Sequence, residues 1–357
     1  MVEVIIVGPN PDPAISLGGV SSVVRFIITN NYRVCYTHFE QGSRDTDNGG
    51  IHKATRVLHN YHRWQALLNE KKPAVIHYNI DLSPLSILRD YPFMRLARRK
   101  GCRLIIHVHG GVFMTSPTVP LLYDFFLKKI FNWDDSPFIV LSEREKARIE
   151  KSYGAKNIHV LPNCVGFPSK ETKDRSEDTI RIGYFGRITE AKGMQELLDA
   201  AIKLKEKQVH FKIFFAGKKE PPVDFVELFT KELGDSFQYI GIVSGKAKNE
   251  FLSGLDVFVL PSYFEGLPMS LLESMSYGIV PVVTAVGSIP EVVEDGENGL
   301  IIKDHDVDTI VAAIERINND KQFVAKMSSN AKETILTRFN PEHYIESLNG
   351  IYNKLQA

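Results

Sequence analysis

Short apolar runs alternate with longer amphipathic segments along most of the chain. In the first half, runs with strand character occupy residues 2–8, 32–39, 74–79, 103–109, 138–142 and 157–163. Helical patterns lie between them, most clearly at residues 19–28, 55–70 and 120–131. The strand runs are mostly apolar throughout rather than alternating, which is typical of parallel strands that are buried on both faces. We therefore predict a parallel sheet with helices on both sides.

The same alternation restarts after a charged stretch, residues 169–179, which we interpret as a linker. Strand runs follow at 180–186, 211–217, 237–243 and 256–262, with helical patterns at 194–204, 224–233 and 248–255 between them. Two such blocks predict an α/β protein with two facing Rossmann-like doubly wound domains, residues 1–165 and 166–340. A final helix at about 341–357 is expected to pack back on the first domain. Residues 41–50 are expected to form a polar loop.

Composition and charge narrow the class of protein only slightly. The 357 residues include 43 basic and 43 acidic side chains, so net charge indicates no special partner and no nucleic acid. Residues 1–165 carry 21 basic and 14 acidic residues, and the remainder carries 22 and 29. Different partners for the two halves and simple solvated faces explain this equally well.

The cellular location is predicted from what the sequence lacks. Its three cysteines form no C-x-x-C pair, no apolar run is long enough to span a bilayer, and the start does not resemble a signal peptide. These features predict a cytoplasmic protein.

Cationic residues follow the strand at residues 180–186. Ligands of open parallel sheets bind beyond the carboxyl ends of the strands, so we expect the site in a cleft between the two domains. Arg187 directly follows Gly186, and Lys192 lies next to an expected helix start. A guanidinium fork, an ammonium and helix N–H groups together suit a diphosphate. Two ordinary surface cations would give the same pattern.

Two glutamates bracket the turn from the strand DVFVLPS to the next helix. In the stretch FEGLPMSLLE they are Glu265 and Glu273, with no charged residue between them. Unpaired N–H groups at the helix start suit a phosphate oxygen or a sugar hydroxyl. A carboxylate can accept hydrogen bonds from the two vicinal hydroxyls of a ribose. The alternatives are a solvated loop acid for Glu265 and a glutamate that stabilises the helix dipole for Glu273.

The surroundings of these residues resemble a known family. The series G-R-x-x-x-x-K-G, AG, DVFVLPS, E-G-x-x-x-x-x-x-E and GIVPVVTAVGSIPEVVEDGENGLII looks like the retaining nucleotide-sugar glycosyltransferases of the GT4 kind (glycosyl transferases group 1). Members have the GT-B architecture of two facing Rossmann-like domains. The likeness is strong over about residues 180–302 and weaker in the first domain.

The resemblance implies a role for each matching residue. Glu273 would bind the ribose, and Glu265 would face the transferred sugar as a catalytic residue. Arg187 and Lys192, with Gly186 beside them, would neutralise the diphosphate. The loop that would support sugar and phosphate consists of Gly266, Leu267, Pro268, Met269 and Ser270.

Two features of the first domain match the family less tightly. Gly18 and Gly19, in SLGGV, resemble a glycine loop that faces the donor diphosphate, although a plain turn is equally plausible. HVHGG ends the fourth strand run, and by the likeness His109 would lie beside the donor sugar as a second catalytic residue. For His107 we favour a hydrogen-bonded core histidine. H-x-H as a metal site would need a third ligand, which the sequence does not offer, so we expect no metal.

The run LLYDFFLKKIFNW at residues 121–133 allows two interpretations. It could be an amphipathic helix lying on a membrane surface, with extra basic charge from residues 95–103. We favour a helix packed on the sheet with its lysines outward. The first interpretation would place the protein peripherally at the cytoplasmic face of a membrane.

Taken with the resemblance, these patterns predict an enzyme of the hexosyltransferase type. It would move a sugar, with retention and without a metal or other cofactor, from a nucleotide sugar to a glycan or lipid-linked glycan acceptor, in bacterial polysaccharide or glycoconjugate synthesis. UDP is expected as the nucleotide only because it is common in the family. The alternatives are a nucleotide-sugar 2-epimerase and a non-catalytic sugar- or nucleotide-binding module. A nicotinamide dehydrogenase is disfavoured, because no G-x-G-x-x-G follows the first strand.

Overall fold

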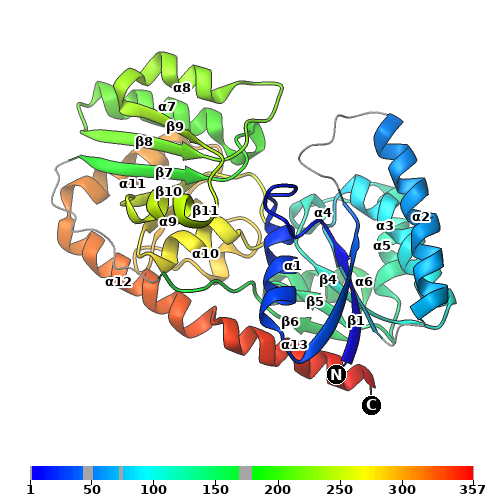
Figure 1. Ribbon diagram of the computed structural model, residues 1–357. Helices are drawn as coiled ribbons and strands as arrows, with labels where there is room; N and C mark the ends of the chain where they lie inside the picture. The colour runs from blue at the N-terminus through cyan, green and yellow to red at the C-terminus, as the bar shows by residue number, and fades with distance from the viewer. Residues whose placement is uncertain (1, 43–50, 72–74, 169–178, 357) are drawn as a thin grey trace. The chain divides into compact units, whose positions relative to one another are not determined.

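The computed structural model describes residues 2–42, 51–71, 75–168 and 179–356. The chain divides into two compact units, which we call the first unit (Met1–Asn163 with Glu342–Ala357) and the second unit (Cys164–Pro341) (Figure 1). Each unit contains a six-stranded parallel sheet with helices on both faces, which confirms the predicted fold class of two Rossmann-like domains. The linker expected at 169–179 lies outside the described residues except for residue 179. Of the polar loop expected at 41–50, only residues 41 and 42 are described.

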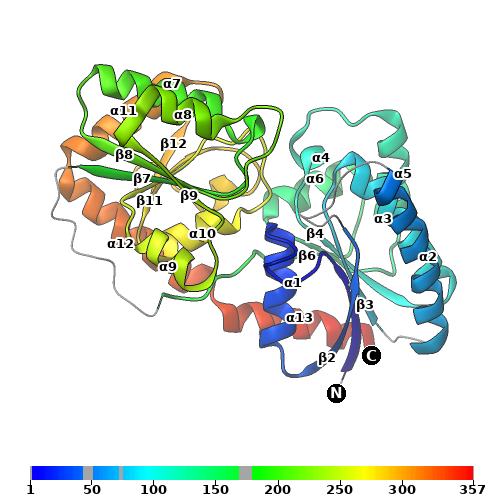
Figure 2. The ribbon, with the colours of Figure 1, turned by 45° about the horizontal axis from the view of Figure 1, so that its top comes forward.

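The sheet of the first unit has the strand order β2-β1-β3-β4-β5-β6. Helices α2, α3, α5 and α6 cover one face, and α1 and α13 cover the other (Figure 2). The strands are β1 (Val2–Gly8), β2 (Val34–Glu40), β3 (Val75–Ile80), β4 (Arg103–Val108), β5 (Phe138–Val140) and β6 (Ile158–Val160). The helices are α1 (Gly19–Asn30), α2 (Ile51–Lys71), α3 (Pro84–Arg99), α4 (Val112–Thr115), α5 (Leu121–Phe131), α6 (Glu143–Tyr153) and α13 (Pro341–Gln356).

The sheet of the second unit has the order β12-β11-β10-β7-β8-β9. Helices α7, α8 and α11 lie on one face, and α9, α10 and α12 lie on the other (Figure 1). The strands are β7 (Ile180–Phe185), β8 (Phe211–Ala216), β9 (Phe237–Gly241), β10 (Val257–Leu260), β11 (Val280–Thr284) and β12 (Leu300–Ile302). The helices are α7 (Met194–Glu206), α8 (Phe225–Leu233), α9 (Gly245–Ser253), α10 (Met269–Ser276), α11 (Val307–Asn319) and α12 (Lys321–Arg338).

Burial explains why these segments become central strands. Every residue of β3, β10 and β11 is buried, as expected of parallel strands between two helical layers. The expected strand at 237–243 is shorter in the structure, because its partner β8 ends at Ala216, which pairs with Gly241. The core of the first unit includes Trp64, which contacts Phe39 and donates a hydrogen bond to Phe93 O.

Both sheets have a switch point where the order of strands reverses. In the first unit β1 lies between β2 and β3, and in the second unit β7 lies between β8 and β10. At such a point the loops after two neighbouring strands diverge to opposite faces and leave a crevice beyond the carboxyl ends. The switch points therefore lie at β1 and β3 in the first unit and at β7 and β10 in the second.

Candidate active site

The predicted donor residues flank the switch point of the second unit. Arg187 and Lys192 follow β7, and Glu265 follows β10, the strand that pairs with β7. Glu273 lies on the second turn of α10, the helix that follows β10. We call these four residues, with the loop 266–270, the strand-end site. Topology brings them to one edge of one sheet, although 86 positions separate Arg187 from Glu273 in the sequence.

An ion pair lies at the centre of the strand-end site. Lys192 Nζ lies 2.6 Å from Glu265 Oε1, and the Ser262 hydroxyl donates to the same oxygen at 2.7 Å. The two charged side chains are only 18% and 10% exposed. Because the pair is largely shielded from water, it is stronger than a surface ion pair and holds Glu265 in one orientation.

Two glycines allow the loops around Glu265 to approach closely. Gly193 has φ +69°, and a Cβ on it would lie 2.1 Å from Pro261 O, so the turn carrying Lys192 presses on the end of β10. Gly287 has φ +56°, and a Cβ there would lie 2.1 Å from Glu265 O. Ser288 N donates to Gly266 O at 3.0 Å across the same contact. No side chain larger than hydrogen fits at either position without moving the loop.

Helix α10 begins inside the strand-end site. Pro268 is its N-cap and supplies no capping side chain, while Met269 and Ser270 open its first turn. The first N–H groups of a helix have no acceptor within the helix and favour an anion. Leu267 is buried at 4% exposure and anchors the loop. Glu273 Oε1 accepts from Lys248 Nζ on α9 at 2.7 Å.

Arg187 is the most exposed member of the strand-end site. Its side chain is 61% exposed, and its Nη1 lies 3.7 Å from Glu220 Oε1, a loose contact. Its backbone is fixed, since the buried Tyr184 hydroxyl donates to Arg187 O at 2.5 Å. The guanidinium can therefore reorient toward an anion at little cost, whereas Lys192 is already held by Glu265.

In the first unit, hydrogen bonds define the tautomer of His109. Asn79 Nδ2 donates to Val7 O at 2.9 Å, so Asn79 Oδ1 accepts from His109 Nε2 at 2.8 Å. Nε2 thus carries the proton, and Nδ1 is left as an acceptor. Burial lowers the pKa of His109 to about 3. This imidazole is neutral at physiological pH and can accept, but not donate, a hydrogen bond at Nδ1.

His107 is a hydrogen-bonded core histidine at the end of a directed chain of donors. Tyr36 accepts from Asn31 and donates to Tyr352 on α13 at 3.2 Å, so the Tyr352 hydroxyl donates to His77 Nδ1 at 2.6 Å. His77 Nε2 then donates to His107 Nδ1 at 3.1 Å. Burial first, and His109 second, lower the pKa of His77 to about 3 and that of His107 well below its usual value. The chain ties α13 to the face of the sheet that carries His109.

Gly18 and Gly19 lie at the start of α1, in the loop after β1. Both are exposed, and Gly18 is the N-cap with φ −66° and ψ 156°. No described atom lies within 4 Å of where a Gly18 Cβ would be. The protein itself therefore does not require glycine at this position, in contrast to Gly193 and Gly287.

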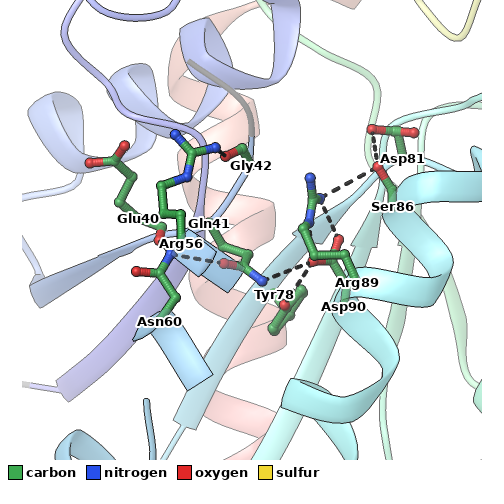
Figure 3. Close-up of polar contacts among 10 residues, drawn as sticks. All are labelled: Glu40, Gln41, Gly42, Arg56, Asn60, Tyr78, Asp81, Ser86, Arg89 and Asp90. Carbon is green, nitrogen blue, oxygen red and sulfur yellow. Dashed lines mark hydrogen bonds and ion pairs between the residues drawn. The ribbon is translucent and has the colours of Figure 1, made fainter. Parts of the chain in front are cut away.

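A second polar cluster lies at the carboxyl ends of β2 and β3 (Figure 3). The fully buried Asp90 accepts two 2.7 Å hydrogen bonds from Arg89 and longer ones from Tyr78 and Gln41, at 3.2 and 3.3 Å. Asn60 on α2 in turn donates to Gln41 Oε1 at 3.2 Å. Burial raises the pKa of Asp90, and Arg89 opposes that shift. The cluster joins α2 and α3 to the sheet edge, and no pattern in the sequence indicates it.

Two cavities of the second unit are lined by described residues. One of about 190 Å³ is lined by Lys248 of α9 and by Glu273, which belongs to the strand-end site. A larger one of about 360 Å³ lies at the amino ends of β8 and β9, beside Lys212 and Phe237. The smaller cavity lies between α9, α10 and residues 165–168 and contains Glu273, so it is the one that concerns the strand-end site. Across the described residues, no three His, Cys, Asp or Glu side chains are grouped to hold a metal ion.

Comparison with known proteins identifies the family. The profile described as glycosyl transferases group 1 matches residues 168–334. The putative glycosyltransferase EpsD of Bacillus subtilis is 30% identical over 277 residues, which cover 72% of this chain and 71% of EpsD. The chain belongs to the glycosyl transferases group 1 family. This membership confirms the resemblance to glycosyl transferases group 1 that the motifs indicated.

Other relatives act in several kinds of pathway, judging by their names. Alpha-D-kanosaminyltransferase of Streptomyces kanamyceticus is 23% identical over 74% of each chain. The capsular polysaccharide biosynthesis glycosyltransferase CapM of Staphylococcus aureus is 26% identical over 49% of this chain and 46% of CapM. The chain thus spans less than half the length of CapM, and 45% of a Methanocaldococcus jannaschii glycosyltransferase that it also matches.

Solved structures share the fold along the whole chain. Sucrose-phosphate synthase from Thermosynechococcus elongatus superposes with a TM-score of 0.80 at 19% identity, covering 99% of both chains. Anabaena HepE in complex with UDP and glucose superposes with a TM-score of 0.76 at 16% identity, covering 99% of this chain and all of HepE. At such identities the likeness concerns the fold alone.

Sequence reasoning missed three groups around the strand-end site. Ser262 holds Glu265, Gly287 fits against the Glu265 carbonyl, and Lys248 holds Glu273. Ser262 ends the run DVFVLPS, and Gly287 follows the strand at 280–284. Both could have been found by examining every residue just beyond the carboxyl end of a strand, where ligands of parallel sheets bind. Lys248 lies within a helical pattern, and no local signal distinguishes it from Lys246.

Proposed function

We propose that this protein is a retaining, metal-independent glycosyltransferase that uses a nucleoside diphosphate sugar, with UDP as the expected nucleotide. The observation that carries the proposal is the shielded Lys192–Glu265 pair at a switch point beside the start of α10, in a chain of this family. The acceptor would be a hydroxyl of a glycan or lipid-linked glycan, as the names of relatives such as CapM suggest.

The chemistry assigned to the strand-end site is charge stabilisation. The bond between the anomeric carbon and the diphosphate oxygen breaks, and its electron pair stays on the diphosphate. Lys192, Arg187 and the N–H groups at the start of α10 stabilise that charge. The acceptor oxygen bonds to the same face of the sugar, and its proton passes to the leaving diphosphate. Glu265 stabilises the positive charge that develops on the sugar.

Glu273 would accept hydrogen bonds from the ribose hydroxyls of the nucleotide. In the first unit, His109 is assigned to the donor sugar, and the neutral tautomer found here would accept a hydrogen bond from a sugar hydroxyl at Nδ1. Gly18 and Gly19 are assigned to the diphosphate, where an exposed glycine leaves space for close approach. These roles extend the family resemblance to individual residues.

The test of the reaction needs no acceptor. The protein is incubated with UDP-, GDP-, ADP- and CDP-sugars, and slow transfer to water is followed by NMR of the released sugar. Retention predicts that the first anomer released is that of the donor, and metal independence predicts an unchanged rate in EDTA. Release of the opposite anomer would refute retention. A 2-epimerase would instead produce an epimerised sugar without acceptor.

We also propose that the first unit contacts a membrane surface. Helix α5 packs through Leu127, Ile130 and Phe131, as expected, but Leu121, Leu122 and Phe125 are 87%, 55% and 54% exposed. The last turn of the same helix carries Lys128 and Lys129, which complement anionic lipid. Across the described residues, no helix has the length and apolar character that crossing a membrane requires.

Vesicle binding tests this surface. The protein should co-sediment with anionic vesicles at low salt, and a Leu121→Ser, Phe125→Ser variant should bind at least about tenfold more weakly, because less apolar area enters the interface. Leu58→Ser is the matched control, since Leu58 on α2 is 66% exposed. No binding at low salt, or equal loss in the control, would refute the proposed surface.

A further inference from the structure

Glu273 is held by a lysine that comes from a different helix. Lys248 Nζ lies 2.7 Å from Glu273 Oε1, and the two side chains are 27% and 18% exposed. Lys248 belongs to α9 and Glu273 to α10, so the pair spans 25 positions of sequence and two neighbouring helices. It is thus a tertiary contact and not a local pairing along one helix.

The pair engages only one of the two carboxylate oxygens. Within the described residues, Glu273 Oε2 has neither a hydrogen bond nor an ion pair. Both side chains line the cavity of about 190 Å³, together with Ser276 and Tyr277. One oxygen is therefore fixed by the protein, while there is open space beside the carboxylate for a ligand hydroxyl.

We propose that Lys248 is the positioning residue that makes the site select a ribose. By fixing Oε1, Lys248 removes the rotational freedom of a glutamate side chain and presents Oε2 as an acceptor. A carboxylate accepts hydrogen bonds, as two ribose hydroxyls require. This inference rests on the proposed nucleotide role of Glu273 and adds to it a residue outside the motifs of the site.

The site would select a ribose because a ligand without its hydroxyls leaves a Glu273 oxygen without a hydrogen-bond donor. A nucleotide that lacks the 2′ and 3′ hydroxyls gives Glu273 Oε2 no donor, so a desolvated carboxylate oxygen remains unpaired. Sites that hydrogen-bond a hydroxyl discriminate strongly against the analogue without it. The discrimination depends on the carboxylate being held in place, and in this chain Lys248 holds it.

Two simpler roles for Lys248 make different predictions. If Lys248 only attracts the diphosphate by its charge, its loss weakens every nucleoside diphosphate equally, with or without ribose hydroxyls. If Lys248 forms only a surface ion pair, its loss leaves the affinity unchanged for nucleotides with and without the ribose hydroxyls. Only positioning of Glu273 makes the effect depend on the ribose hydroxyls.

The experiment is a titration by calorimetry with two ligands. UDP, GDP, ADP and CDP are compared first, and the tightest is then paired with its 2′,3′-dideoxy form. Wild type should bind the ribose form about 30-fold more tightly than the dideoxy form. Lys248→Met should reduce that ratio to about 3 by weakening only the ribose form, and Lys248→Arg, which keeps the charge, should restore part of it.

Two further variants complete the design. Lys246→Met is the matched control, because Lys246 lies on the same helix, is 90% exposed and pairs with Glu250 instead. Its ratio should equal that of wild type. In a Glu273→Gln background, Lys248→Met should have no further effect on the ratio, since the two residues act as one unit.

The outcomes separate the inference from the function on which it rests. An unchanged ratio in Lys248→Met, with or without an equal loss for both ligands, overturns the inference and leaves the nucleotide site intact. A ratio that falls further in the double variant than in Glu273→Gln also overturns it. If wild type binds none of the four nucleoside diphosphates, the proposed function fails, and the inference fails with it.

Discussion

The two six-stranded parallel sheets carry polar side chains in different places and chemical forms: charged residues follow β7 and β10 in the second unit, and histidines lie within β3 and β4 in the first. The second unit holds Lys192 and Glu265 as a paired set of charges, 18% and 10% exposed. The first unit holds His77 and His107 as neutral imidazoles that are fully buried in a hydrogen-bonded chain. Paired charges suit binding of a charged ligand, whereas the neutral chain fixes the position and tautomer of its members. The same architecture thus supports two kinds of polar site.

The largest expected difference between the units is their response to acid. A histidine with a pKa near 6.5 unfolded and about 3 folded gives stability that is complete above pH 6.5 and falls as the pH drops toward 3. Each such group lowers the free energy of unfolding by about 1.4 kcal/mol for each pH unit in that window. His77 and His109 together therefore lower it by about 3 kcal/mol for each pH unit. The pKa of His107 is lowered as well, so this residue adds to the loss of stability in acid. The raised pKa of Asp90 has the opposite effect on stability, but it is one group against three.

Tryptophan fluorescence can follow this loss in the first unit alone. Both tryptophans of the chain, Trp64 and Trp133, belong to that unit. Their emission should change between about pH 5 and pH 4, where the loss reaches the typical stability of a domain. Hydrogen exchange of β7, β8 and β10 should remain slow at the same pH. Loss of protection in the second unit first would contradict the comparison.

The next largest effect concerns the charges of the second unit. Glu265→Gln keeps the shape of the side chain but removes the charge that would stabilise the transferred sugar. We expect the turnover number to fall about 100-fold or more, as for other groups that stabilise a transition state electrostatically. Glu250→Gln on α9, whose side chain is 67% exposed, is the control and should leave turnover unchanged. Full transfer by Glu265→Gln would remove its assigned role.

Two glycines differ in how closely other atoms approach them in the two units. Gly287→Ala forces a Cβ into φ +56° and 2.1 Å from Glu265 O, so we expect a loss of about 3 kcal/mol in the free energy of unfolding. Gly18→Ala has φ −66° and no described atom within 4 Å, so stability should change by no more than about 0.5 kcal/mol. Chemical denaturation measures both. Equal destabilisation by the two variants would show that the loops are not built differently.

The smallest effect tests the chain of hydrogen bonds in the first unit. Tyr352→Phe removes the hydroxyl between Tyr36 and His77, leaving buried polar groups unpaired. The expected cost is about 2 kcal/mol of unfolding free energy. Tyr32→Phe, at an 81% exposed position, is the control and should be neutral. A neutral Tyr352→Phe would mean that α13 does not depend on this hydroxyl.

The fold was predictable because its signals are local and repeated. Apolar runs such as 75–80 and 257–260 identify buried parallel strands by composition alone, and family motifs place Glu265 and Glu273 after the right strand. The pairing of side chains from different helices could not be predicted in this way. Nothing in the sequence distinguishes Lys248, which binds Glu273, from Lys246, which binds Glu250, because helical spacing does not say which lysine faces the neighbouring helix.

The hydrogen-bonded network around His77 and His107 in the first unit could not be predicted either, because its partners also come from distant parts of the sequence. His107 was expected to be a core histidine, but its partner His77 and the hydroxyl of Tyr352 come from β3 and the distant helix α13. The pair of Arg89 and Asp90 was missed as well, since adjacent residues of a helix do not normally face each other. In the structure, Arg89 Nε nevertheless lies 2.7 Å from Oδ1 of the fully buried Asp90.

The central claim is that the carboxyl edge of the second unit binds a nucleoside diphosphate through Glu273. The most direct test is the melting temperature with UDP, GDP, ADP and CDP and their sugar conjugates, because a ligand that binds only the folded state raises it. We expect that one base stands out and that Glu273→Ala abolishes its shift. If no nucleotide raises the melting temperature of the wild-type protein, the claim is contradicted.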